Sequence, residues 1–189
     1  EKNFNTLALI KNNTMKKLIT IFTLAVSTFT FSQNSTTLKS NDIVINPVAL
    51  VLGAVNVEYE RIISENSGIG VTTSFLLDDY IIDDNNGFSI TPYYNYYFGK
   101  KRANGFYIGG YCSINSGDVE KSYYVSSQYG GYTMYTTEKE TNFGVGFKFG
   151  GKWVVKNDIV LEIGTGLGRN FGGENKVNTT GMLGIGKRF

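Results

Sequence analysis

Apolar and polar side chains alternate along most of the chain, in segments of about ten residues. In the clearest segment, 142–153, bulky side chains share one face while glycines, an asparagine and lysines share the other. Because successive side chains of a β-strand point to opposite faces, this period of two predicts strands. The segments lie near 43–52, 55–63, 68–77, 88–98, 106–115, 142–153, 159–168 and 179–189.

The two faces of these segments predict what surrounds them. One face carries Phe, Ile and Val and ends in aromatic residues, whereas the other is rich in glycine with a few charges. A barrel of about eight strands has a narrow interior that side chains fill. An apolar outer band with aromatic girdles is typical of barrels in membranes. We therefore predict an all-β fold, a closed antiparallel up-and-down transmembrane β-barrel of about eight strands, with ten strands as the alternative.

The joints between segments differ in length in a regular way. Three of them, at 64–67, 99–105 and 155–157, are short. Three of the intervening joints, at 78–87, 117–140 and 171–178, are longer, although the first joint, near Gly53, is short. Short periplasmic turns and longer external loops are the known asymmetry of outer-membrane barrels, so the long joints are expected outside the cell.

The N-terminal part has the pattern of a signal for export. Lys16 and Lys17 follow Met15, an apolar stretch runs to Phe31, and Ser32 provides a small residue for cleavage. We expect 1–14 to be an upstream or mis-started segment, 15–32 the signal peptide, 33–40 a short N-terminal segment and 41–189 the barrel. The predicted location is the outer membrane of a Gram-negative bacterium.

Composition and charge narrow the possible functions. The chain has 23 Gly, 13 Tyr and 13 Phe but only 18% charged residues, fewer than a soluble surface needs. Removal of 1–32 leaves 14 basic and 15 acidic residues, so the net charge changes from +2 to −1 and the excess of basic residues belongs to the leader. We expect no nucleic-acid partner.

The last segment resembles the signature by which barrel precursors are recognised for insertion. It alternates to a terminal Phe189, and Lys187 stands where that signature usually has an aromatic residue. The region 41–189 resembles small eight-stranded outer-membrane proteins of the OmpA-transmembrane-domain and OmpX type. Segments 90–101 and 149–154 resemble a bacterial outer-membrane family of unknown function. The resemblance implies outer-membrane lipid and the barrel-insertion machinery as partners, and Phe189 as the insertion signal.

Catalytic chemistry has little support in the sequence. The chain contains no histidine, and a serine nucleophile needs an adjacent base. Cys112 is the single cysteine, so no thiolate metal site can form. We expect a protein that is not an enzyme, with no catalytic, cofactor-binding or metal-binding residues and no cofactor.

Two groups of residues remain as candidate sites. Charges that fall on the lumenal face must pair, because isolated ions in a low dielectric are costly. They are Glu58, Glu60, Lys148 and Glu162, and they form either a packed plug or a salt-bridge gate over a narrow ion path. The second group is a candidate recognition loop within 117–140, in which tyrosines lie among small polar residues as in binding loops. It contains Tyr123, Tyr124, Tyr129, Tyr132 and Tyr135.

Three functions follow from these candidates. The first is a non-enzymatic outer-membrane barrel with a structural role or a surface-recognition role for an unknown external ligand. The second is a narrow channel gated by the lumenal charges. The third is a soluble lipocalin-like carrier.

Overall fold

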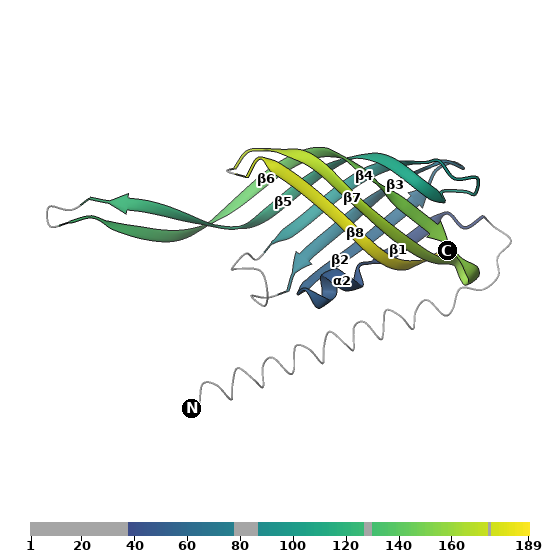
Figure 1. Ribbon diagram of the computed structural model, residues 1–189, viewed down its shortest axis with the longest axis horizontal. Coiled ribbons are helices and arrows are strands. Elements are labelled where there is room, and N and C mark those ends of the chain that lie inside the picture. The colour runs from purple at the N-terminus through teal and green to yellow at the C-terminus, as the bar shows by residue number, and fades with distance from the viewer. Residues whose placement is uncertain (1–37, 78–86, 127–129, 174) are drawn as a thin grey trace, which may run out of the picture. The chain divides into compact units, whose positions relative to one another are not determined.

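The computed structural model describes residues 38–77, 87–126, 130–173 and 175–189, and the unit Lys39–Phe189 forms a β-barrel (Figure 1). Its strands are β1 (Asn41–Ile45), β2 (Ala54–Ile62), β3 (Ser67–Leu76), β4 (Phe88–Tyr97), β5 (Gly105–Val125), β6 (Tyr132–Val154), β7 (Ile159–Phe171) and β8 (Val177–Arg188). The expected segments 1–14 and 15–32, and most of 33–40, lie outside the described residues.

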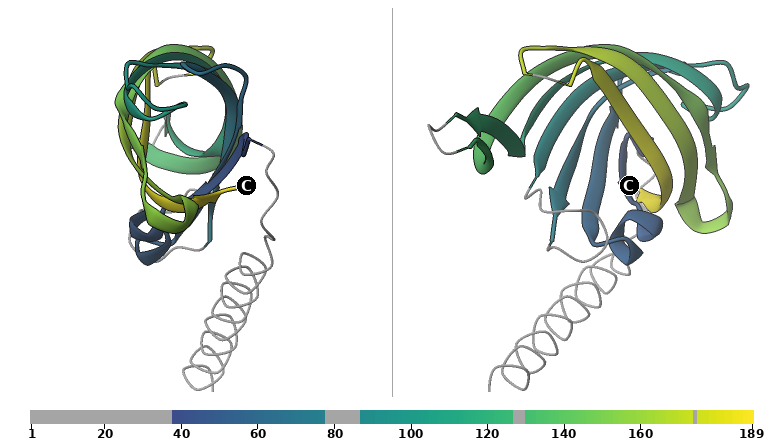
Figure 2. Two further views of the ribbon diagram at one scale, coloured as in Figure 1. Left: turned by 90° about the vertical axis from the view of Figure 1, so that its right-hand side faces the viewer. Right: turned by 60° about the vertical axis from the view of Figure 1, so that its left-hand side comes forward.

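Each strand pairs antiparallel with its neighbours in sequence order, and β1 pairs with β8 to close the barrel. The closing register runs from Asp42 opposite Arg188 to Ile45 opposite Ile185. The left view of Figure 2 shows the resulting ring of strands. Closure leaves no strand edge in the wall with unpaired backbone groups, which would be costly in lipid. The predicted fold class is confirmed, with eight strands and not ten.

The first predicted segment, 43–52, is only partly a strand. β1 ends at Ile45, and a short helix, α2, occupies Pro47–Val51. Pro47 has no N–H to continue a strand ladder, and its fixed φ suits the first turn of a helix. The Asn46 side chain accepts a hydrogen bond from the Ala49 N–H at 3.1 Å and caps this helix. Within the described residues, no helix is long and apolar enough to cross a membrane.

The two longest strands extend far beyond the others. β4 pairs with β5 only as far as Ser116, and β7 pairs with β6 only as far as Phe143. Beyond those positions β5 and β6 continue to pair with each other, up to Val125 opposite Tyr132. Within the predicted loop 117–140, the segments 117–125 and 132–140 therefore form a two-stranded ribbon, which we call the external hairpin (Figure 1).

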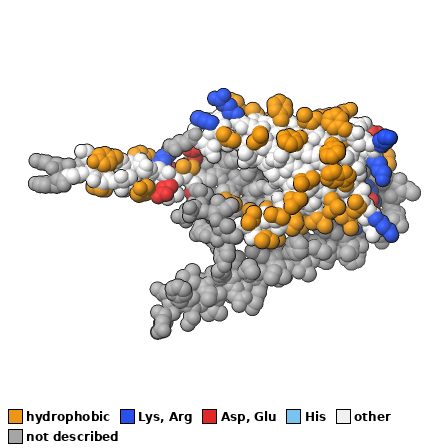
Figure 3. All heavy atoms as spheres, viewed as in Figure 1, with side chains coloured by type: hydrophobic (Ala, Val, Ile, Leu, Met, Phe, Trp, Pro, Cys, Tyr) orange, Lys and Arg blue, Asp and Glu red, His pale blue; other side chains and the backbone are white. Residues whose placement is uncertain are grey.

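Side chains sort between the two faces of the barrel wall. Large apolar residues such as Phe147, Ile163 and Leu167 are exposed on the outer face, and hydrophobic side chains cover it broadly (Figure 3). Aromatic pairs stand toward both ends of this face, with Phe106 against Trp153 at 5.8 Å and Phe75 against Phe88 at 4.9 Å between ring centroids. This arrangement is the inverse of a soluble barrel, because the exposed face is apolar and the enclosed face is polar.

Inside the barrel, tyrosines lie over glycines. A Cβ atom added at Gly146 or Gly168 would overlap the Tyr111 side chain, and one at Gly150 or Gly164 would overlap the Tyr107 hydroxyl. Any side chain larger than hydrogen on this part of β6 and β7 would displace a ring. The glycine-rich inner face seen in the sequence thus makes room for large side chains from β5 across the lumen.

Candidate functional site

The lumen holds the buried charges of the barrel. Among the described residues the buried charged side chains are Asp42, Glu58, Glu60, Lys148, Lys152, Glu162 and Arg188. They come from five strands, and their alternate positions all face inward. We call this set the lumenal charge cluster. It lies toward the end of the barrel that carries the turns 63–66, 98–104 and 155–158, which we call the turn end.

Lys152 is the centre of the lumenal charge cluster. Its side chain is 0% exposed, and its Nζ atom lies 2.9 Å from Glu162 Oε2 and 3.2 Å from Glu58 Oε1. The same ammonium group pairs with Glu60 and lies 3.9 Å from Asp42 Oδ2. One ammonium group therefore contacts four carboxylates from three strands, which holds β1, β2 and β7 against β6, and Lys148 and Arg188 supply further positive charge to Glu58 and Asp42.

Lys148 lies two inward positions further from the turn end on β6, with Gly150 between it and Lys152. Its Nζ atom donates to Glu58 Oε2 at 3.4 Å and stands 3.7 Å from the centre of the Tyr93 ring. The ring faces the cation with its negative quadrupole, which adds to the attraction of the carboxylate. Glu58 thus accepts from both lysines, and it also accepts from the Thr72 hydroxyl at 3.1 Å.

Tyrosine hydroxyls satisfy further carboxylate oxygens. Tyr97 donates to Glu60 at 2.7 Å, and Tyr107 donates to Glu162 at 2.9 Å. Tyr97 and Tyr107 also pack edge to face with ring centroids 5.5 Å apart. Neutral donors of this kind stabilise buried carboxylates without adding a charge to the lumen.

The turn end of the lumen is closed by Arg188. Its guanidinium group makes two hydrogen bonds to Asp42, at 2.7 and 2.9 Å. It also donates to the carbonyl oxygens of Arg102 and Ala103 at 2.8 and 2.9 Å. Ala103 is fully buried. The turn 98–104 therefore folds over the barrel mouth and is fastened there by Arg188.

The other half of the lumen is more open and has no buried charged side chain, although Asp118 and Glu140 lie at its rim. A cavity of about 400 Å³ opens toward the external hairpin and is lined largely by Asn, Ser and Thr. At its floor Asn178 donates to Ser113 at 3.0 Å and to Asn170 at 2.8 Å, and it accepts from Tyr111 at 2.8 Å. The lumen is thus open at the hairpin end and filled by side chains at the turn end.

The external hairpin carries the candidate recognition residues on both of its faces. Tyr124 is 73% exposed and Tyr135 is 65% exposed, and both lie on the face that continues the outer wall. Tyr123 and Tyr132 continue the inner face and are also exposed. Tyr129 lies outside the described residues.

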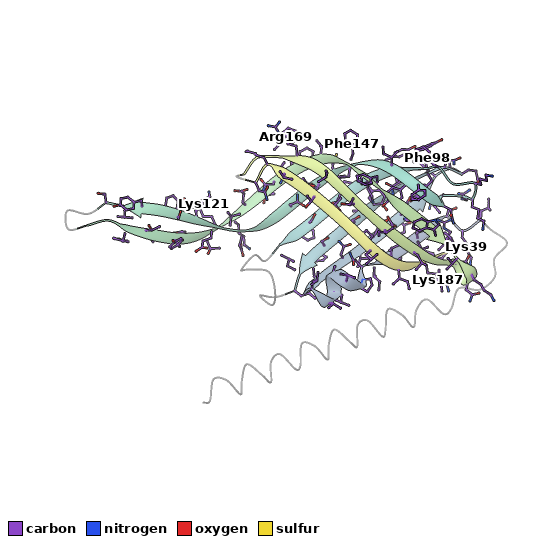
Figure 4. All side chains as sticks on the ribbon, in the orientation of Figure 1. Lys39, Phe98, Lys121, Phe147, Arg169 and Lys187 are labelled. Atoms are coloured by element: carbon purple, nitrogen blue, oxygen red, sulfur yellow. The ribbon has the colours of Figure 1, made fainter. Side chains whose placement is uncertain are left out.

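An ion pair on the hairpin ties its two strands together. Lys121 Nζ lies 2.8 Å from Glu138 Oε2, and the Tyr123 hydroxyl donates to Glu138 Oε1 at 3.1 Å. These two hydrogen bonds hold the pKa of the Glu138 carboxyl below its ordinary value, and the hydrogen bond from Lys121 has the larger effect. In Figure 4, Lys121 stands on the ribbon well away from the barrel.

The structure brings together all four charges that the sequence singled out, Glu58, Glu60, Lys148 and Glu162. Lys148 pairs with Glu58, whereas Lys152 pairs with all three glutamates. Asp42 and Arg188 were not expected in the cluster. The available signal was the strand parity. Arg188 occupies an inward position of the last segment, and Asp42 has the same parity as the inward Val44 but lies one residue before the first segment of the sequence pattern.

Among the described residues, no group of three or more His, Cys, Asp or Glu side chains is arranged to hold a metal ion. Around Lys152 the carboxylates converge on an ammonium group that already occupies their centre. Chemically, this cluster can hold strands together and block the lumen. Free Cys112 faces outward and is exposed.

The sequence matches no protein-family model and no curated protein. Among solved structures, the chain is similar to the outer-membrane protein Ail of Yersinia pestis, with 15% identity over 80% of this chain and 100% of that one and a TM-score of 0.46. It is also similar to the N-terminal β-barrel domain of OprF of Pseudomonas aeruginosa, with 12% identity over 80% of this chain and 98% of that one and a TM-score of 0.47. Both likenesses concern the fold alone. The closed antiparallel barrel of eight strands is itself the fold that the resemblance in the sequence implied.

Proposed function

We propose that this protein is a non-enzymatic outer-membrane barrel that presents the external hairpin to a partner outside the cell. The observation that carries the proposal is the continuation of β5 and β6 beyond the wall as a ribbon with exposed tyrosines. The exposed apolar outer wall supports the membrane location, because such a surface in water would drive aggregation. Its aromatic residues near both ends fit two membrane interfaces.

The unpaired strand edges of the external hairpin also provide backbone groups for hydrogen bonding to a partner. Among the described residues, no strand pairs with the outer edge of β5 beyond Ser116 or of β6 before Phe143. Unpaired N–H and C=O groups along a strand edge can pair with an extended segment of another chain. Tyrosines beside that edge supply rigid contact area at a low entropic cost. The partner that fits this surface best is an extended polypeptide segment.

The two other functions fit the structure less well. A channel requires a continuous path, whereas Lys152, Glu60 and Asp42 fill the lumen and are 0% exposed. A soluble carrier requires an apolar interior and a polar exterior, and both are reversed here. The filled half of the lumen supports a structural role for the charges, as a plug that fixes the strands in register.

The membrane location is tested by heat-modifiability. The chain is expressed from Met15 in a Gram-negative host, and its membrane fraction is run on SDS gels with and without boiling. A closed barrel that resists detergent gives a faster band when unboiled. Recovery of the protein in the soluble periplasm, with no shift, would contradict the membrane proposal.

The recognition role is tested by photo-crosslinking on intact cells. A photo-reactive phenylalanine analogue replaces Tyr124 or Tyr135, with Phe147 in the outer wall as the matched control. We expect discrete protein adducts from the hairpin positions and none from position 147. A heat-modifiable barrel without adducts at either hairpin position would leave only the structural role.

A further inference from the structure

The outer face of the barrel wall carries charges of one sign only. Among the described wall residues, the outward-facing charged side chains are Arg61, Arg169 and Lys187, and the carboxylates of Asp42, Glu58, Glu60 and Glu162 all face the lumen. Charge on a lipid-facing wall is costly at mid-depth but is tolerated near the interfaces. Arg169 lies at the hairpin end and Lys187 at the turn end (Figure 4). Arg61 also lies at the turn end, because it is next to the last residue of β2.

Arg61 and Lys187 flank the same strand. On one side of β1, Arg61 stands opposite Asn41, and on the other side Lys187 stands opposite Ile43. Their strands are therefore two spacings apart, on the order of 10 Å, which the two long side chains can bridge. Within the described part of the chain, no carboxylate pairs with Arg61.

The residues around these two cations are apolar or aromatic. Tyr59 lies opposite Ile43, donates to the Asn41 side chain at 2.9 Å and is exposed. Ile185 and Phe189 are exposed on the same outward row as Lys187. Lys187 also stands where the barrel-insertion signature usually has an aromatic residue, so its charge is not explained by that signature.

The same end of the barrel is basic beyond this patch. Lys100, Lys101 and Lys156 are exposed in its turns, and Lys and Arg side chains gather at that end beside the hydrophobic band (Figure 3). Two acids of these turns, Glu65 and Asp158, are themselves paired with Arg102 and Lys39. A surface of this kind attracts anions, and the neighbouring apolar band selects anions that carry acyl chains.

We propose that the outward face of β1, β2 and β8 at the turn end binds the headgroup of an anionic phospholipid. The phosphate accepts hydrogen bonds from the guanidinium group of Arg61 and the ammonium group of Lys187, and Tyr59 and Phe189 lie at the level of the glycerol backbone. The acyl chains then lie along the outward-facing aliphatic side chains of β1 and β8. This inference rests on the proposed membrane location, which places phospholipid at this end.

The test is native mass spectrometry of the full barrel, purified from nanodiscs that contain equal parts of phosphatidylglycerol and phosphatidylcholine. We expect retained lipid to be enriched in phosphatidylglycerol. A cation near an anionic surface contributes roughly fivefold, so the pair gives about twenty-five-fold. The double variant Arg61→Gln, Lys187→Gln should bring the ratio close to one, and the charge-preserving variant Arg61→Lys, Lys187→Arg should keep most of the enrichment.

The matched control is Lys100→Gln, Lys101→Gln, which removes the same charge from a turn at the same end. It should keep the enrichment, and excess inorganic phosphate should not displace the retained lipid. Equal retention of the two lipids by the wild-type barrel would overturn the proposal, as would loss of enrichment in the turn control. The heat-modifiability gel separates these failures from failure of the membrane location, because a compact band without lipid selectivity contradicts only the lipid site.

Discussion

β5 and β6 each have a part inside the barrel wall and a part in the external hairpin, and the two parts differ in pairing and burial. Within the wall, each strand pairs on both sides, and the inner face of β6 carries Lys148 and Lys152 into a buried network. In the external hairpin, the strands pair only with each other, and their ion pair, Lys121 with Glu138, is partly exposed. The wall half gains stability from burial and pairing, and the hairpin half keeps its edges and tyrosines available for contact.

The comparison predicts that the same substitution has unequal effects in the two halves. Lys152→Met keeps the apolar stem but removes the ammonium group that lies among Glu58, Glu60 and Glu162. Removal of one partner from a buried ion pair costs about 3–5 kcal/mol, because it leaves charge without compensation. We expect the temperature at which the compact gel band is lost to fall strongly.

Lys121→Met is the matched control for this prediction. Its ion pair is partly exposed, with side chains 30% and 43% accessible, so solvent screens it and the temperature at which the compact band is lost should change little. The decrease in the temperature at which the compact band is lost should be intermediate for Lys148→Met, because Glu58 keeps Lys152 as a partner. Equal shifts for Lys152→Met and Lys121→Met would show that burial does not distinguish the two halves.

A second prediction concerns packing on the two faces of the wall. Gly146→Val would force its Cβ against the Tyr111 ring, and overpacking of this kind costs about 1–3 kcal/mol. Gly110→Val is the control on the adjacent strand, since its Cβ would meet no atom closer than 4.0 Å and would face outward. Thermal melting of the two variants on the same gel assay checks this. A normal melting point for Gly146→Val would mean that Tyr111 does not fill the lumen beside β6.

The alternation of side chains was enough to predict the wall but not the hairpin or the centre of the charge cluster. Phe143 to Trp153 alternate because one face of β6 is the exposed, apolar face of the wall and the other lines the polar lumen. The segments 117–125 and 132–140 lie beyond the wall and have no enclosed face, so no alternation marks them as strands, and only the pairing of β5 with β6 reveals the ribbon. The pairing partners of Lys152 depend on the tilt and closure of the barrel, which bring β1, β2 and β7 to the same height, and the local pattern carries no information on that height.

The smallest expected effect lies in the hairpin, at Glu138. Because Lys121 and Tyr123 donate to its carboxylate, the pKa of Glu138 lies below its ordinary value. A lowered pKa means that this contribution to hairpin stability is fully present above the ordinary value and is lost as the pH falls through the lowered one. The carboxyl carbon of Glu138, followed by NMR in nanodiscs, should therefore titrate at a lower pH than a solvated glutamate. Lys121→Gln should return the midpoint most of the way and Tyr123→Phe by less, because the Lys121 hydrogen bond is the larger cause. A midpoint that neither substitution moves would show that the ribbon does not hold these side chains together in solution, and the tyrosines beside them would then lack the fixed spacing that recognition requires.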